Sequence, residues 1–361
     1  MHRYRLHPPG AVAILRRMVD WHPGSPVFGP VLWRGDALAR KSERWTWTIP
    51  ADGIREIEHA TETAAARGYG SATLPDDPEA FPLPGLAGLF GEVAAALREG
   101  TGVALVRGLP IEGRTPAEIE LILRGIGAQL GVCVSQNHRG ERVGQVMDVS
   151  AEMSDPRRYQ AGGEFRMHID PIDIVGLLCV RKAKEGGESQ VVSSAAVHNT
   201  VLSERPDLID ALYEGFRLFR PPADRGDAPA LTKGPVPIFA ADLAGRFAAY
   251  FLPDPVHQAE TRAGEVPSDV AREALAYADA VAQRPGLVLE MDLVPGDLQF
   301  LNNRTVLHGR TDYLDHADKT RRRLMLRLWL MARDWPDLSP RQRFFDDFDK
   351  LGGGIPARAA E

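Results

Sequence analysis

The stretch RRRLMLRLWL, residues 321–330, limits the fold more than any other part of the chain. Side chains alternate between the two faces of a strand, so one face is mainly leucine and the other carries Arg323, Met325, Arg327 and Trp329. The leucine face must be buried against a core. A guanidinium turned into an interior is costly without an anion, so the other face predicts a site for a ligand that bears a carboxylate. The alternatives for the arginines are a solvated basic edge and a phosphate-binding patch.

Short β-rich segments recur along the second and third quarters of the chain and near its end, with helical segments beside them. The sequence predicts strands over 102–111, 174–183, 190–195, 287–303 and 321–332, and helices over 54–68, up to Arg98, and over 116–131, 195–213 and 273–286. The segments do not alternate regularly as strand, helix, strand. The pattern therefore predicts an α+β protein with a mainly β core, a jelly-roll or barrel-like sandwich that carries helices.

Proline and glycine clusters suggest where the chain divides. We expect a helical N-terminal flank over residues 1–90 that packs on the core, a catalytic β domain over 91–335, and a C-terminal tail over 336–361. Two polar segments, 152–166 and 221–237, are expected to be lid insertions that carry the substrate specificity.

Composition and charge exclude several classes of protein. The 361 residues are 44% hydrophobic and 25% charged, which is typical of a globular protein, and the net charge of −6 argues against a nucleic-acid partner. No apolar run reaches about 18 residues, so no membrane partner is expected. Cys133 and Cys179 lie in apolar runs and are expected to be buried thiols, which fits the cytoplasm. The sequence sets no expectation of oligomeric state.

The stretch FRMHIDPID, residues 165–173, places a histidine and a carboxylate two residues apart. On a strand, positions i and i+2 share a face about 7 Å apart, so His168 and Asp170 can lean onto one metal ion while Ile169 faces the other way. Pro171 disfavours a helix at Asp170. The alternative is a buried histidine that is hydrogen-bonded to its neighbouring aspartate.

A third ligand would have to come from a distant strand. His308 in FLNNRTVLHGRTDY is the best placed of the remaining histidines, because it follows a strand and precedes Gly309, which permits close backbone approach. His138 and His316 lie in charged loops, and His198 lies in a helix where packing explains it. Two histidines and one carboxylate form a facial triad of the kind found in non-haem Fe(II) oxygenases.

Four motifs in order resemble a known family: HID at 168–170, GGES at 186–189, PGDLQFLNNRTVLHGRTDY at 295–313 and RRRLMLRLWL at 321–330. Together they resemble the taurine dioxygenase and clavaminate synthase-like superfamily of Fe(II)- and 2-oxoglutarate-dependent oxygenases. The resemblance covers about residues 100–333. It implies a double-stranded β-helix, a jelly roll, with flanking helices.

The resemblance also implies roles for particular residues. The expected Fe(II) ligands are His168, Asp170 and His308, and the expected partners of the distal carboxylate of 2-oxoglutarate are Arg323 and the hydroxyl of Ser189. Arg327 is expected near the cosubstrate or near an acidic group of the substrate. Gln136 and Asn137 resemble a segment that reaches the substrate in relatives.

The chemistry implied by the resemblance consumes O₂ and 2-oxoglutarate, releases succinate and CO₂, and oxidises a C–H bond of a small molecule. Hydroxylation of an amino acid or an amino-acid-derived metabolite is expected, with desaturation or cyclisation as an alternative outcome. The carboxylate of Asp170 disfavours a halogenase, since halogenating relatives lack it. Two other classes remain open, a non-catalytic metabolite-binding protein and a Zn(II) hydrolase at the same ligands.

Overall fold

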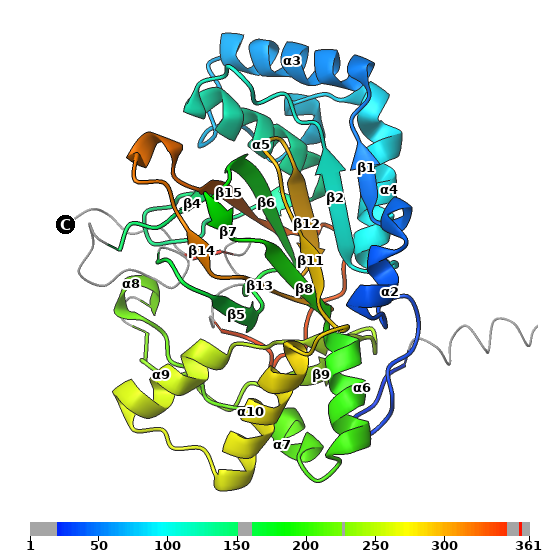
Figure 1. Cartoon of the computed structure of the whole chain (residues 1–361), viewed down its shortest axis with the longest axis vertical. Helices are drawn as coiled ribbons and strands as arrows, with labels where there is room; N and C mark the ends of the chain where they lie inside the picture. Colours follow the sequence, from blue (N-terminus) through cyan, green and yellow to red (C-terminus); the bar gives the residue numbers. More distant parts are fainter. Residues whose placement is uncertain (1–19, 151–160, 226–227, 345–353, 356–361) are drawn as a thin grey trace, which may run out of the picture.

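The computed structural model describes residues 20–150, 161–225, 228–344 and 354–355 (Figure 1). Two β-sheets form its centre, and helices gather at both ends of the sheets. The blue and cyan helices lie at one end of Figure 1, and the green and yellow helices lie at the other. The observed architecture is therefore a mixed α/β protein with a sheet-rich core.

The larger sheet has seven strands in the order β1-β2-β12-β6-β15-β3, and β4 pairs with β15 beside β3. The strands are β1 (Thr46–Thr48), β2 (Val103–Arg107), β12 (Leu298–Asn302), β6 (Ile174–Arg181), β15 (Leu324–Met331), β3 (Val132–Cys133) and β4 (Val143–Val146). Only the β1–β2 pair is parallel, and the other described pairs of this sheet are antiparallel.

Helices cover the outer face of the larger sheet. They are α3 (Ala51–Ala66), α4 (Ala87–Arg98) and α5 (Pro116–Leu130). The expected start of α5 is confirmed, because Thr115 caps it in a reciprocal capping box with Glu118. A Cβ at Gly127 of α5 would lie 2.8 Å from Leu328 Cδ1, so glycine lets this helix pack directly on β15. Leu326, Leu328 and Leu330 are buried beneath these helices, which confirms the leucine face.

The smaller sheet faces the opposite side of β15. Its four strands lie in the order β11-β8-β13-β5, with bounds β11 (Leu289–Met291), β8 (Ser189–Ser193), β13 (Val306–Arg310) and β5 (Phe165–His168). Met325 and Trp329 of β15 share one hydrophobic core with Met167 and Val191 of this sheet. The two faces of β15 thus enter two different cores, as the alternation predicts.

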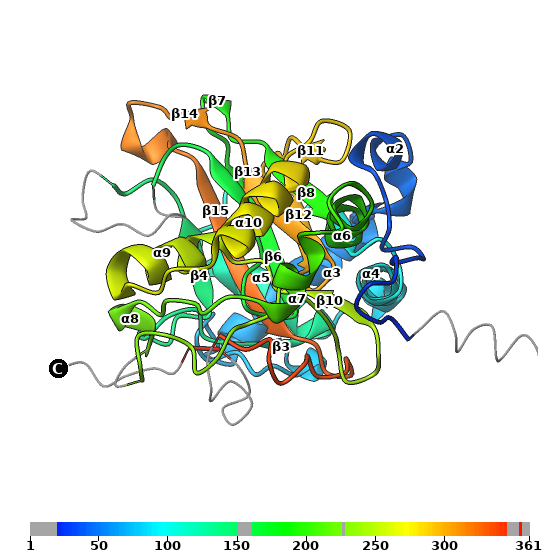
Figure 2. The ribbon, with the colours of Figure 1, turned by 90° about the horizontal axis from the view of Figure 1, so that it is seen from below.

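A second group of helices closes the other end of the molecule. It consists of α6 (Ser194–Glu204), α7 (Ile209–Glu214), α9 (Pro253–Ala263) and α10 (Asp269–Ala282), which Figure 2 shows from below. Ser193 caps α6 and Ser268 caps α10. Shorter elements complete the described chain: α2 (Gly35–Ala39), α8 (Pro222–Arg225), 3₁₀ turns at Ser42–Arg44, Pro78–Ala80, Pro84–Leu86 and Lys319–Arg321, and the strand pairs β9 (Phe239–Ala241) with β10 (Phe247–Ala249) and β7 (Glu185–Gly186) with β14 (Tyr313–Leu314).

The expected division of the chain differs from the structure in two places. The boundary expected at residue 90 falls inside α4, and β1 of the flank joins the larger sheet through β2, so the flank is not wholly helical. In the expected tail, the side chains of Phe344 and Ile355 are buried in the core. These differences have one cause: contacts between segments far apart in the sequence extend the core beyond its expected bounds.

The expected lid segments and cysteines can be placed in part. Most of 152–166 lies outside the described residues, whereas 221–237 contains α8 and is held by bridges from Phe216 to Val236 and from Phe219 to Leu231. Both cysteines are free and buried, as expected. Among the described residues, no helix has the length and apolarity needed to cross a membrane.

Candidate metal centre

His168, Asp170 and His308 converge on one point of the smaller sheet. One ligand-capable atom of each residue lies within 4.8 Å of the others. The convergence follows from strand pairing, because His308 of β13 is the direct partner of His168 of β5. Their ring centroids are 4.3 Å apart. Asp170 follows the end of β5, where the backbone N–H of Ile169 donates to Phe251 O at 3.0 Å.

The imidazole of His168 is held in one orientation and one tautomer. Its Nδ1 lies 2.9 Å from Arg166 O, and since a carbonyl can only accept, Nδ1 carries the proton and Nε2 is left as the ligand atom. Phe165 stacks on the ring with a centroid distance of 4.0 Å. Burial lowers the pKa of His168, which keeps the imidazole neutral.

His308 is likewise neutral. Burial, and after it the neighbouring His168, lowers the pKa of His308 to about 3. Its Nδ1 is buried and has no hydrogen-bond partner among the described residues. Gly309 brings the strands together here, because a Cβ at this position would lie 2.6 Å from Phe165 O. The close approach expected at Gly309 is therefore present.

Asp170 is a buried carboxylate with several donors around it. Trp329 Nε1–H donates to Oδ2 at 2.8 Å, and Arg327 Nη1 lies 3.2 Å from each carboxylate oxygen. Burial alone would raise the pKa of Asp170, but the Arg327 guanidinium, with the hydrogen bond from Trp329 in addition, holds that pKa below its usual value. The carboxylate is therefore ionised, as a metal ligand must be.

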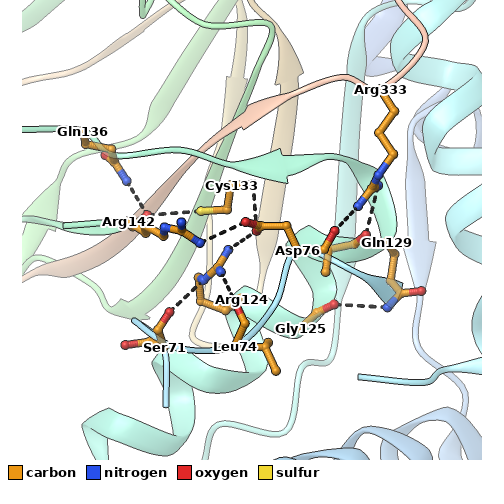
Figure 3. A network of polar contacts seen from close by, with 11 residues as sticks. Ser71, Leu74, Asp76, Arg124, Gly125, Gln129, Cys133, Gln136, Arg142 and Arg333 are labelled. Atoms are coloured by element: carbon orange, nitrogen blue, oxygen red, sulfur yellow. Dashed lines mark hydrogen bonds and ion pairs between the residues drawn. The ribbon is translucent and has the colours of Figure 1, made fainter. Parts of the chain in front are cut away.

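Gln136 makes two hydrogen bonds to Arg327, one to its side chain and one to its backbone. Its Oε1 accepts from Arg327 Nε at 2.8 Å, and its Nε2 donates to Arg327 O at 2.7 Å and to Arg142 O at 2.9 Å. The bond to Arg142 belongs to a polar network that extends to Asp76 and Arg124 (Figure 3). Gln136, expected to reach the substrate, makes these hydrogen bonds within the protein and also lines the cavity described next.

Gln136, Asn137 and Arg327 line a cavity of about 510 Å³, and Arg327 also binds Asp170. Asn137 also shapes the loop, because its Oδ1 accepts from the backbone of Arg139 and its Nδ2 donates to Glu141. Side chains of both charges line this cavity. The basic ones are Arg139, Arg142 and Arg327, and the acidic ones are Glu120 and Glu141.

Arg323 and Ser189 lie further along the same interior. Arg323 is 4% exposed, and its Nη1 has no hydrogen-bond partner among the described residues. Ser189 is buried on β8, with its Oγ 3.0 Å from Gln299 Nε2 and 3.1 Å from Gln299 Oε1. A buried guanidinium without a carboxylate fits a site for an anionic ligand.

Comparison with known proteins decides the family. The model of the "Taurine catabolism dioxygenase TauD, TfdA family" matches residues 71–329. The chain belongs to the TauD/TfdA family. Relatives include FR-33289 synthase of Streptomyces rubellomurinus, 32% identical over 84% of this chain and 90% of the relative, and a taurine hydroxylase-like protein of Stachybotrys chartarum, 28% identical over 89% and 86%.

Solved structures share the fold of this TauD/TfdA protein. Asparagine oxygenase in complex with Fe(II), 2S,3S-3-hydroxyasparagine and succinate matches with a TM-score of 0.65 and 19% identity, over 87% of this chain and 100% of the other. The chain is an Fe(II)- and 2-oxoglutarate-dependent dioxygenase that uses O₂. Its own donor set fits that metal, since two neutral imidazoles and one carboxylate meet at one point.

Four other residues of this TauD/TfdA protein can be compared with the sequence predictions: His198, His138, Trp329 and Tyr313. His198 packs in the core as expected, with Nε2 bonded to the hydroxyl of Tyr213 at 2.8 Å. His138 lies in a charged loop and is half-buried, with a buried Nδ1. Neither the hydrogen bond from Trp329 to Asp170 nor the contact of Tyr313 with Arg323 was predicted. Trp329 could have been found, because it shares the arginine face of the strand.

Proposed function

We propose that this protein hydroxylates an amino acid or an amino-acid-derived metabolite, with His168, Asp170 and His308 as the ligands of Fe(II). The observation that carries the proposal is the meeting of the three ligand atoms within 4.8 Å. A triad of this composition leaves three metal positions for other ligands. The two facing sheets support a double-stranded β-helix as the finer description of the fold.

We assign the distal carboxylate of 2-oxoglutarate to Arg323 and Ser189. The buried Nη1 of Arg323 needs an acceptor, and Ser189 Oγ, which accepts from Gln299 Nε2, can redirect its proton from Gln299 Oε1 to a carboxylate. When bound, iron and 2-oxoglutarate supply the oxidation of a C–H bond, coupled to decarboxylation of the cosubstrate to succinate. The protein supplies the ligands, their orientation and a shielded interior.

The cavity beside Arg327 supports a zwitterionic substrate. Its volume of about 510 Å³ lies in the range for small-molecule sites, and its lining carries both guanidinium and carboxylate groups. An amino acid presents one carboxylate and one ammonium group, and a cavity with charged groups of both signs suits such a molecule. Arg327 lines this cavity and also binds Asp170, which supports a substrate site on this side of the triad. The asparagine oxygenase of similar fold, solved with hydroxyasparagine, supports this class.

The test is an assay of succinate release. Protein with Fe(II), 2-oxoglutarate and O₂ is screened against single amino acids, their N-acyl derivatives and the corresponding decarboxylated amines. We expect substrate-dependent succinate and a hydroxylated product from a member of the first two sets and none from the amines. Succinate release that no amino acid or derivative stimulates, but that an amine does, would overturn the substrate class.

A ligand variant tests the metal assignment. Asp170→Ala should lower coupled turnover by roughly 100-fold or more, because loss of even an outer-shell partner costs 10–100-fold in metal sites. The matched control is Asp292→Ala, which removes an exposed carboxylate paired with Lys182 and should leave turnover unchanged. Full coupled turnover in Asp170→Ala would refute the assignment.

A further inference from the structure

We infer that the hydroxyl of Tyr313 is a further donor to the distal carboxylate of 2-oxoglutarate, next to Arg323. The inference rests on the proposed function, because it concerns the same cosubstrate site. Its basis is the buried hydroxyl of Tyr313, which has no hydrogen-bond partner in the described part of the chain, on a ring that contacts two buried arginines.

The position of Tyr313 depends on the double glycine of the GGES motif. Tyr313 of β14 pairs with Gly186 of β7, and both Gly186 and Gly187 have positive φ, at 73° and 80°. A Cβ on Gly187 would lie 3.2 Å from Arg323 Nε and 3.4 Å from Tyr313 Cβ. The glycines therefore let the backbone pass close to both side chains, which keeps Tyr313 and Arg323 against one another.

Two donors at this place lack acceptors. The hydroxyl of Tyr313 and Nη1 of Arg323 are both buried, and neither has a hydrogen-bond partner among the described residues. Buried polar groups in proteins are nearly always paired, so two neighbouring exceptions call for a ligand. A carboxylate has two oxygens that only accept, and it can receive both donors at once.

Charged groups of both signs lie near the Tyr313 ring. The guanidinium carbons of Arg310 and Arg323 lie 4.6 and 5.5 Å from the centroid of the Tyr313 ring. Two carboxylates, Asp148 and Asp315, also lie near the phenol. Asp148 Oδ1 accepts from Ser150, and Asp315 Oδ1 accepts from the backbone N–H of Arg323 at 2.8 Å and from that of His316 at 3.0 Å, while Asp315 Oδ2 has no hydrogen-bond partner among the described residues. No ion pair joins the Arg323 guanidinium to a carboxylate in the described part of the chain. The Tyr313 ring thus lies beside two guanidinium groups, and the inference depends on the unpaired donors of Tyr313 and Arg323.

Tyr313 and Ser189 would supply two hydroxyls from different elements. Ser189 lies on β8 and is oriented by Gln299, whereas Tyr313 lies on β14 and is oriented by Gly187 and the arginines. A dicarboxylate would meet Arg323 and both hydroxyls at its distal end. A 2-oxo acid that lacks the distal carboxylate would meet none of them.

The experiment compares two ligands in two variants. Under anaerobic conditions, Fe(II)-loaded protein is titrated with 2-oxoglutarate or with 2-oxopentanoate, which has no distal carboxylate, and the weak visible charge-transfer band of the chelate gives each Kd. For Tyr313→Phe we expect the Kd of 2-oxoglutarate to rise about tenfold, since a hydrogen bond to a charged group is lost, while the Kd of 2-oxopentanoate stays unchanged. The control Tyr69→Phe removes a half-buried phenol from the helical end and should change neither.

Each result decides one point. An unchanged Kd for 2-oxoglutarate in Tyr313→Phe overturns the inference, and so does an equal rise for both ligands, because that indicates a structural role. Thermal unfolding of the variant shows whether it is folded. Absence of the band in the wild-type protein with either ligand would instead refute the proposed function, and the inference would fall with it.

Discussion

Arg327 binds the carboxylate of Asp170, with Nη1 3.2 Å from each oxygen, while Gln136 binds the same guanidinium at Nε. Asp170, a candidate metal ligand, therefore forms an ion pair with Arg327, which also lines the cavity of about 510 Å³. Any ligand that draws Arg327 toward the cavity changes the charge beside Asp170. This pairing leads to the first prediction.

Arg327→Met should move metal binding to higher pH. In the wild-type protein, burial acts to raise the pKa of Asp170, and Arg327 is the largest of the groups that lower it. Without the guanidinium, the carboxylate takes up a proton at a higher pH, and a protonated carboxyl does not bind metal. The acid limb of Mn(II) binding, measured by electron paramagnetic resonance from pH 5 to 8, should shift upward.

The control for this variant is Arg55→Met, which removes an exposed guanidinium paired with Asp52 on α3, away from the triad and from the network of Figure 3. Its acid limb should match that of the wild-type protein. An acid limb in Arg327→Met that stays in place, or moves to lower pH, would show that Arg327 does not set the ionisation of Asp170.

Trp329→Phe should weaken metal binding while an aromatic ring still fills the same part of the core. The indole N–H donates to Asp170 Oδ2 at 2.8 Å, and phenylalanine keeps an aromatic ring in the space while removing this donor. Loss of an outer-shell hydrogen bond typically costs about 10–100-fold in metal affinity. Competition between the protein and a chelator for Mn(II) measures the Kd.

Trp47→Phe is the matched control, because Trp47 Nε1 donates to Glu92 at 2.8 Å on the exposed side of the molecule. Its metal affinity should equal that of the wild-type protein. If the two tryptophan variants lose metal affinity to the same extent, the Trp329 bond to Asp170 has no specific role in metal binding.

The local alternation of β15 was predictable, and the contacts across strands were not. A period of two places Arg323 and Arg327 on the face opposite Leu326, and the structure confirms that assignment. The direct pairing of His168 with His308 depends on the register of strands from distant parts of the sequence, which no local pattern determines. His308 is singled out by its place after a strand and before Gly309, and the family resemblance adds its role as a ligand.

The assignment of Gln136 shows a second limit. The sequence places it in a loop near the site, but the direction of its amide depends on Arg327 O and Arg142 O, which come from separate segments. Likewise, β1 joins the larger sheet by a parallel pairing with β2, a contact that the helical pattern of the flank does not indicate. In both cases the missing information is tertiary.

The metal-free protein should lose stability as the pH falls below about 6.5, in part through His308. Its pKa in the folded protein is about 3, because of burial, so between these values the unfolded chain binds a proton that the folded chain does not. This difference lowers the free energy of unfolding by up to about 1.4 kcal/mol per pH unit for one group. Burial lowers the pKa of His168 and His198 in the same direction.

Urea unfolding of wild-type protein and His308→Gln at pH 7.5, 6.5, 5.5 and 4.5 measures the slopes. The variant should show a shallower loss of unfolding free energy, since glutamine does not titrate. Equal slopes for the two proteins would mean that His308 is protonated in the folded state as readily as in the unfolded state.

Asp76→Asn should destabilise the fold, because Asp76 is the only carboxylate bonded to a buried arginine in the network of Figure 3. Arg124 has a fully buried side chain, and its Nη1 donates to Asp76 Oδ1 at 2.8 Å, while Arg142 binds Asp76 Oδ2 at 2.9 Å. Breaking a buried ion pair on one side leaves an uncompensated charge and costs about 3 kcal/mol. Chemical denaturation at pH 7.5 gives the free energy of unfolding.

Asp76→Asn should also weaken metal binding, through a chain of hydrogen bonds that leads to Asp170. Arg142 O accepts from Gln136 Nε2, and Gln136 Oε1 accepts from the Arg327 guanidinium that binds Asp170. Displacement of Arg142 should therefore weaken the hydrogen bonds that orient Arg327. We expect weaker Mn(II) binding in folded Asp76→Asn, by less than in Trp329→Phe because the change acts through three intermediate residues, Arg142, Gln136 and Arg327. Asp334→Asn, which breaks an exposed pair with Arg98, should change neither stability nor metal affinity. Wild-type Mn(II) affinity in a destabilised Asp76→Asn would show that the network supports the fold alone, with no effect on the orientation of Arg327.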